Sequence, residues 1–123
     1  MDRQYNKRRE WSKPESRTLV FCLPLFYNPD AAGTSVAIEP EKFAETEREI
    51  RRNFAGYSRF PITGWYRDEA TGEEFVDHLL RFEVDGSFTG EQLEYLKRWK
   101  RELEERFAQR AIYFKFTSPE TCW

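Results

Sequence analysis

The stretch from Pro61 to Asp85 constrains the fold most, because it has the pattern of a long β-hairpin. Two runs rich in aromatic and β-branched residues flank the turn sequence Glu69-Ala70-Thr71-Gly72. Runs of this kind, separated by a short turn, predict a pair of antiparallel strands. Gly72 stands where such a turn needs a positive φ, which glycine adopts without steric cost.

Counting back from this turn predicts how the two strands pair: Arg67 faces Glu74, and Thr63 faces His78. Side chains of a strand alternate between its two faces. The more apolar face is expected to meet the helices, and it holds Trp65, Val76, His78, Leu80, Phe82 and Val84. The opposite face, with a contribution from the last strand, is expected to form a protein interface through Ile62, Tyr66, Phe75, Asp77, Leu79, Arg81 and Tyr113.

Two strand–helix arms enclose the hairpin. Residues 17–27 form an apolar strand expected to be central, with Pro24 limiting its pairing, and Pro40 opens a helix that stops before Gly56. After the hairpin, Thr89-Gly90-Glu91-Gln92 has the pattern of a capping box for a second helix, and residues 111–116 alternate as a half-buried strand. The order β-α-β-β-α-β with right-handed crossovers predicts an α+β, ferredoxin-like fold: a four-stranded antiparallel sheet with two helices on one face.

The 123 residues suffice for one domain, which we place at residues 17–117. Residues 1–16 are expected to be a mobile basic arm, and residues 118–123 a C-terminal tail. No leader sequence or long apolar run is visible, which favours a cytoplasmic location. Cys22 and Cys122 match no metal or disulfide pattern, and Cys22 is expected to be an inert core thiol in an apolar strand.

The hairpin motif also carries a resemblance. Gly64-x-Tyr66-Arg67-Asp68, followed by Thr71-Gly72, resembles a group of small uncharacterised bacterial proteins that have a Gly-x-Trp-Arg-Asp hairpin between two helices. The resemblance spans the middle half of the chain. It implies the hairpin and its flanking helices, and it carries no activity with it.

Candidate chemistry is sparse. His78 is the single histidine and follows Asp77, but neighbouring strand residues point to opposite faces, so a buried structural histidine is favoured over an acid–base pair. The acids at the hairpin tip lack the spacing of a cation site and are expected to be solvated, with Arg67 pairing Glu74 across the strands. No motif predicts a cofactor or a metal.

Charge is distributed unevenly although the net charge is only −2. The hairpin from Arg67 to Asp85 is acidic, whereas the N-terminal arm is basic and offers candidate contacts to nucleic acid or another anion: Arg3, Lys7, Arg8, Arg9 and Lys13. The open sheet face offers Tyr66, Phe75 and Tyr113, aromatic side chains of the kind that stack on bases in RNA-recognition sheets. It also carries Asp77 and Glu83, and the third strand lacks the Lys/Arg-Gly-Phe-x-Phe signature of those sheets.

These patterns favour a noncatalytic protein-interaction domain that forms a homodimer through its open sheet face. A nucleic-acid or nucleotide-binding module that uses the basic N-terminal arm and the open sheet face is the second hypothesis. A small enzyme that uses carboxylates on the sheet face or at the hairpin tip is the third.

Overall fold

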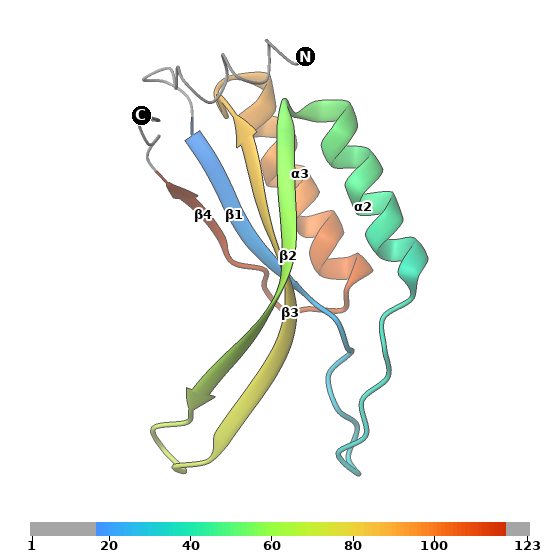
Figure 1. The fold of residues 1–123 in the computed structure, drawn as a ribbon, viewed down its shortest axis with the longest axis vertical. Helices are drawn as coiled ribbons and strands as arrows, with labels where there is room; N and C mark the ends of the chain where they lie inside the picture. The colour runs from blue at the N-terminus through green and yellow to red at the C-terminus, as the bar shows by residue number, and fades with distance from the viewer. Residues whose placement is uncertain (1–16, 118–123) are drawn as a thin grey trace.

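The elements follow one another in the order β-α-β-β-α-β, as the sequence predicts. A computed structural model describes residues 17–117 of the chain (Figure 1). Its elements are β1 (Arg17–Pro24), α2 (Pro40–Asn53), β2 (Gly56–Arg67), β3 (Glu74–Gly86), α3 (Glu91–Arg106) and β4 (Phe114–Thr117).

The strands form one four-stranded sheet in the order β2-β3-β1-β4, and all neighbouring pairs are antiparallel. The two central strands are β1 and β3, which confirms the central position expected for the apolar first strand. β1 also pairs with β4, so that Thr18 lies opposite Thr117. The hairpin register is confirmed as well, with Arg67 opposite Glu74, and Gly72 closes the turn at a φ of 75°.

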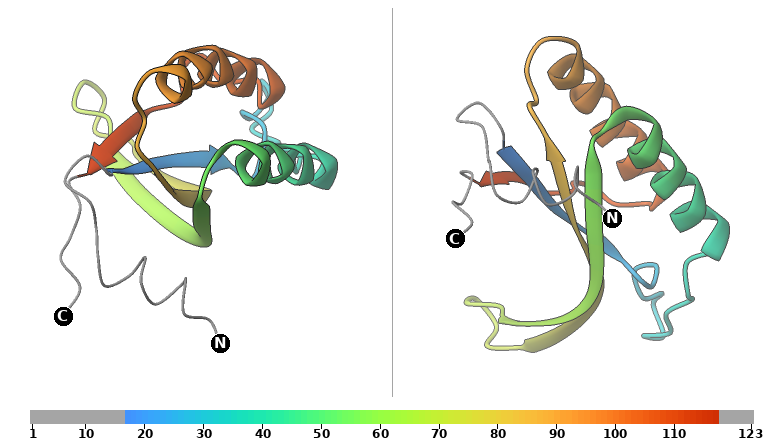
Figure 2. Two further views of the ribbon diagram at one scale, coloured as in Figure 1. Left: turned by 90° about the horizontal axis from the view of Figure 1, so that it is seen from above. Right: turned by 45° about the horizontal axis from the view of Figure 1, so that its top comes forward.

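The core lies between one face of the sheet and the two helices, which are on the same side of it (Figure 2, left). Phe21 of β1 stacks on Phe82 of β3 with ring centroids 5.1 Å apart. The indole of Trp99 from α3 meets Phe21 edge to face at 5.5 Å. All three side chains are essentially fully buried, and such aromatic contacts add to the free energy gained by burying apolar area.

The helices begin in two different ways. Pro40 occupies the first turn of α2, where the missing N–H costs nothing. The predicted capping box of α3 is wrong, since Gly90 is the N-cap at a φ of 55° and no side chain caps the helix. Gln92 instead accepts the Phe88 N–H at 3.0 Å through its side-chain oxygen.

Two strands, β1 and β4, are shorter than the sequence predicts. β1 ends at Pro24 rather than Tyr27, because proline cannot donate to the ladder, and Phe26 forms only an isolated bridge with Ala37. β4 has four residues and begins at Phe114. Ile112 lies before it and is nevertheless buried in the core.

The hairpin is much longer than the helices that cover it. β3 has 13 residues, about 43 Å at ~3.3 Å per residue, whereas α3 has 16 residues and spans about 24 Å at ~1.5 Å per residue. The outer half of β2 and β3 therefore extends past both helices, as Figures 1 and 2 show. No helix in the part of the chain described here is long and apolar enough to span a membrane.

Truncating Phe82 to alanine tests this account of the core. We expect Phe82→Ala to lower the free energy of unfolding by about 3–5 kcal/mol, because the site is fully buried and leaves a cavity. The matched control is Phe26→Ala, at a phenylalanine that is largely exposed, which should cost about 1 kcal/mol or less. Urea unfolding followed by circular dichroism measures both, and equal losses would contradict the core assignment.

Candidate functional site

The outer half of the hairpin is the most unusual surface of the described chain. We call residues 62–67 of β2 and 74–79 of β3 the projecting ribbon. It carries large apolar side chains in solvent: Trp65 is 58%, Val76 55% and Tyr66 48% exposed. An isolated two-stranded ribbon is marginally stable in water, so this segment is expected to pack against something.

The expectation that Trp65, Val76 and His78 pack beneath the helices is wrong. All three are exposed, although Leu80, Phe82 and Val84 of the same face are buried as predicted. The alternation along β3 is as expected; what differs is that the helices end before they reach the outer half of the strand. A period-2 pattern indicates which side chains share a face, but it does not say how far the covering layer extends.

His78 is therefore not a core residue. Its ring lies 6.4 Å from that of Phe26 in an edge-to-face arrangement, and its backbone carbonyl accepts the Leu25 N–H at 3.1 Å. Asp77 lies opposite Gly64, and His78 opposite Thr63, so the two side chains point to opposite faces as predicted. The structure does not bring them together as an acid–base pair.

The face of the sheet opposite the helices holds the predicted interface residues. We call this the open face, and on β2 and β3 it comprises Phe60, Ile62, Tyr66, Phe75, Asp77, Leu79, Arg81 and Glu83. Ile62 lies directly opposite Leu79, and Tyr66 directly opposite Phe75. The Tyr66 and Phe75 rings stack with centroids 5.1 Å apart. These two cross-strand pairs form an apolar strip on the open face that the Gly64–Asp77 pair interrupts.

Charged groups of both signs are interspersed with this strip. Arg81 Nε lies 3.2 Å from a carboxylate oxygen of Glu83, and its guanidinium lies 5.9 Å from the centre of the Phe60 ring. Tyr113 is 80% exposed, but it precedes β4 and so belongs to a loop rather than to the sheet. Its predicted place on the last strand is wrong.

The expectation that Cys22 lies in the core is wrong, because β1 places it on the open face opposite Arg81, where it is only partly buried. Burial raises the pKa of its thiol, and the nearby Arg81 guanidinium offsets this effect only in part. A thiol with a raised pKa is a weak nucleophile at neutral pH, in keeping with the expectation of an inert cysteine. Cys122 lies outside the described residues.

One acid of the hairpin tip, Asp68, accepts hydrogen bonds from the backbone of the turn. A carboxylate oxygen of Asp68 accepts the N–H groups of Ala70 at 2.8 Å and Thr71 at 3.2 Å. Arg67 and Glu74 form the predicted cross-strand ion pair at 2.9 Å. Across residues 17–117, no group of three or more His, Cys, Asp or Glu side chains is arranged to hold a metal ion.

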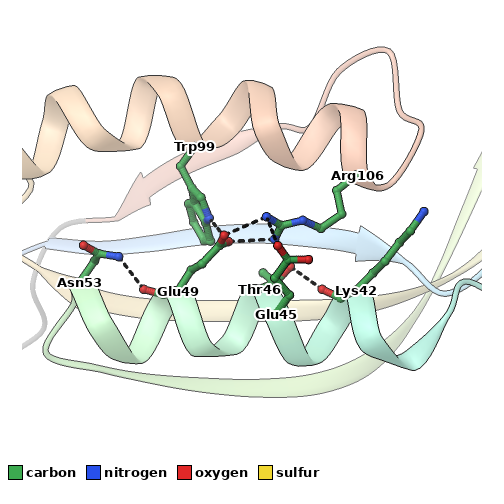
Figure 3. Close-up of polar contacts among 7 residues, drawn as sticks. All are labelled: Lys42, Glu45, Thr46, Glu49, Asn53, Trp99 and Arg106. Atoms are coloured by element: carbon green, nitrogen blue, oxygen red, sulfur yellow. Dashed lines mark hydrogen bonds and ion pairs between the residues drawn. The ribbon is translucent and has the colours of Figure 1, made fainter.

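One cluster of polar and charged groups, which the sequence does not predict, joins α2 to α3 (Figure 3). Glu49 of α2 accepts two hydrogen bonds from the Arg106 guanidinium of α3, both at 2.8 Å. The same carboxylate accepts the Trp99 indole N–H at 2.7 Å. Arg106 also donates to the hydroxyl of Thr46, which is fully buried, and it lies 3.4 Å from Glu45.

Glu102 and Arg106 are four residues apart, a spacing that predicts an ion pair on the exposed surface of α3. The structure turns its guanidinium toward α2 instead, where it is only 12% exposed. The signal that was available is Trp99: an indole buried on the apolar stripe of a helix needs an acceptor for its N–H, and a carboxylate on the facing helix supplies one.

Burial of the Glu49 carboxylate acts to raise its pKa, but the hydrogen bonds from Arg106 and Trp99 outweigh this effect and lower the pKa overall. The same environment acts on Tyr95, whose pKa is raised to about 12 by burial and by the negative charge of Glu49. No buried side-chain nitrogen or oxygen in the described residues lacks a hydrogen-bond partner. The buried polar atoms of the cluster are therefore hydrogen-bonded within it, which is typical of a contact that stabilises the packing of two helices.

The basic residues proposed to contact nucleic acid, Arg3, Lys7, Arg8, Arg9 and Lys13, lie outside the described residues. The structure neither places them nor relates them to the open face.

The fold defines the class of this protein: it is a ferredoxin-like α+β domain. Among solved structures, it is similar to CutA from Synechococcus elongatus, with a TM-score of 0.55 and 16% identity over 89% of this chain and 80% of that one. It is also similar to a phage SAM lyase in complex with S-methyl-5'-thioadenosine, with a TM-score of 0.57 and 13% identity over 89% and 85% of the two chains.

A third similar structure is the periplasmic divalent cation tolerance protein CutA from Archaeoglobus fulgidus, with a TM-score of 0.54 and 12% identity over 88% of this chain and 87% of that one. No family model and no curated protein matches the sequence. At these identities the likeness establishes the fold alone.

Removing the arginine of the inter-helix cluster should be costly. We expect Arg106→Gln to lower the free energy of unfolding by about 3 kcal/mol, because it leaves the Glu49 carboxylate largely buried without its cation. Arg101→Gln, at an exposed arginine of the same helix, is the control and should change stability by about 0.5 kcal/mol or less. Urea unfolding at neutral pH measures both variants; comparable losses would show that the cluster does not hold the helices.

The lowered pKa of Glu49 also predicts a dependence on pH. Its stabilising contribution is complete above the pKa of an unfolded glutamate, about 4.3, and is lost as pH falls through the lower folded-state pKa. We therefore expect Glu49→Gln to be less stable than the wild type at neutral pH, and this difference to shrink steadily below that unfolded value. Urea midpoints across the acid range test this, and a difference that stays constant with pH would contradict it.

Proposed function

We propose that this chain is a noncatalytic interaction domain that associates with further copies of itself through the open face. The observation that carries the proposal is the apolar part of the open face, which neither helix covers because both helices lie on the other side of the sheet (Figure 2). There Tyr66 is 48% exposed and stacks on Phe75, and Ile62 lies opposite Leu79. Apolar patches of this kind on a folded domain mark interaction surfaces.

A second copy suits the open face because the face is complementary to itself in charge. It carries Arg81 and, from β4, Lys115 together with Asp77 and Glu83. In a two-fold contact the same patch meets itself, so each cation of one copy has carboxylates available on the other. The Ile62–Leu79 and Tyr66–Phe75 pairs would then lie in the centre of the contact.

The same acids disfavour phosphate binding by the open face, so we advance no nucleic-acid function for it. The inter-helix cluster supports a role without catalysis, because its carboxylate and guanidinium are committed to each other and to Trp99.

Light scattering of the purified protein tests the proposal. We expect a mass at micromolar concentration that is a multiple of the 14.9 kDa chain mass. A charge in the centre of the open face should lower that mass, so we expect Leu79→Asp, or Tyr66→Asp at a more exposed position, to form smaller assemblies. Circular dichroism establishes that each variant is folded.

The control is Val36→Asp, at an exposed apolar residue of the loop between β1 and α2, which should leave the mass unchanged. A monomeric wild type would refute self-association. A wild type that assembles but is insensitive to both open-face substitutions would place the contact elsewhere.

A further inference from the structure

A second apolar surface lies on the other side of the sheet, where the hairpin leaves the body. It is a groove of about 790 Å³ between the start of α2, the loop that precedes it and β2. Ile38, Phe43, Pro61 and Leu80 line it, and Ala44 is exposed at its α2 side. We call it the Pro61 groove. Most of the residues that line it are apolar, which is typical of a site that receives an apolar side chain.

Among residues 17–117, the most exposed cross-strand apolar pair lies on the same side of the ribbon as this groove. Trp65 and Val76 are directly opposite each other in the register, and both are more than half exposed. The Arg67 guanidinium lies 5.3 Å from the centre of the Trp65 ring and is held there by its ion pair with Glu74. We call Trp65 and Val76 the Trp65 knob. A rigid aromatic side chain of this kind is the residue type that most often anchors a protein contact.

The Trp65 knob cannot enter the Pro61 groove of its own chain. Pro61 and Trp65 lie on one extended strand, four residues and about 13 Å apart at ~3.3 Å per residue. Both side chains stand on the same face of that strand, so one cannot fold back over the other without breaking the β2–β3 ladder. Only another chain can bring a knob to this groove.

Charge favours a second copy as that chain. Glu47 and Arg59 form an ion pair at 2.9 Å along the groove, and both line it. The knob carries a pair of the same composition, Arg67 with Glu74. With the knob seated, Arg67 of one copy can approach Glu47 of the other while Glu74 approaches Arg59, which gives the contact a register as well as an apolar anchor.

We propose that the Trp65 knob of one copy inserts into the Pro61 groove of the next, in a head-to-tail contact between different surfaces. The contact uses the ribbon face opposite the open face, so the two contacts can form at the same time. The inference rests on the proposed function in one respect, since both take a further copy of this chain as the partner.

The contact is tested by mixing two variants, one that lacks the knob and one whose groove is obstructed. Leu79→Asp is introduced first, to remove the open-face contact, and the protein is expected to remain assembled through the knob and groove. In that background Trp65→Glu removes the knob and Ala44→Arg obstructs the groove, both at exposed positions that the fold tolerates. Each double variant should be a monomer by light scattering, with an unchanged circular dichroism spectrum.

An equimolar mixture of the two double variants should regain a twofold higher mass, because the intact knob of the Ala44→Arg copy meets the intact groove of the Trp65→Glu copy. A contact between identical open faces predicts no such rescue. The inference is overturned if Leu79→Asp alone is monomeric, if either double variant assembles like Leu79→Asp, or if the mixture stays monomeric. If Leu79→Asp alone is monomeric but the wild type assembles, the open-face proposal is still supported. If the wild type is also monomeric, both the open-face contact and the contact between knob and groove are refuted.

Discussion

The Phe21 side chain is the contact on which the layers of this domain converge. Its ring stacks on Phe82 of β3, meets the edge of Trp99 from α3, and lies 4.9 Å from the ring of Phe114 of β4. One residue of the central strand thus touches a neighbouring strand on each side and a helix above. The burial of these rings determines where α3 packs on the sheet. The Glu49–Arg106 ion pair then positions α2 beside α3.

Much of this fold follows from local patterns in the sequence. The turn at Gly72 determines the register of a 12-residue strand against a 13-residue one, and every pair counted from it is the pair observed. The apolar run from Leu19 to Leu23 is typical of a strand whose two faces are both shielded from water, and this condition is met most readily in the middle of a sheet. Alternation and turn chemistry are properties of nearby residues, which is why they can be read from the chain alone.

What could not be read is the extent of the covering layer. Whether His78 is buried depends on where α2 and α3 end relative to β3, and that is a matter of tertiary packing rather than of period. Arg106 shows the same limitation, since its spacing from Glu102 satisfies a helical surface pair equally well. The candidate interaction surfaces arise from this mismatch in length: the open face was expected from alternation, whereas the Trp65 knob was expected to be core.

The position of β1 has a consequence for how the chain folds. β1 comes first in sequence, yet it lies between β3 and β4 and pairs Thr18 with Thr117, so its two ladders close long loops. The β2–β3 ladder, in contrast, closes through a four-residue turn and costs little loop entropy. The hairpin is therefore free to form early. The sheet is completed only when β1 has paired with both β3 and β4, which are distant from it in sequence, and such a topology is associated with slower folding.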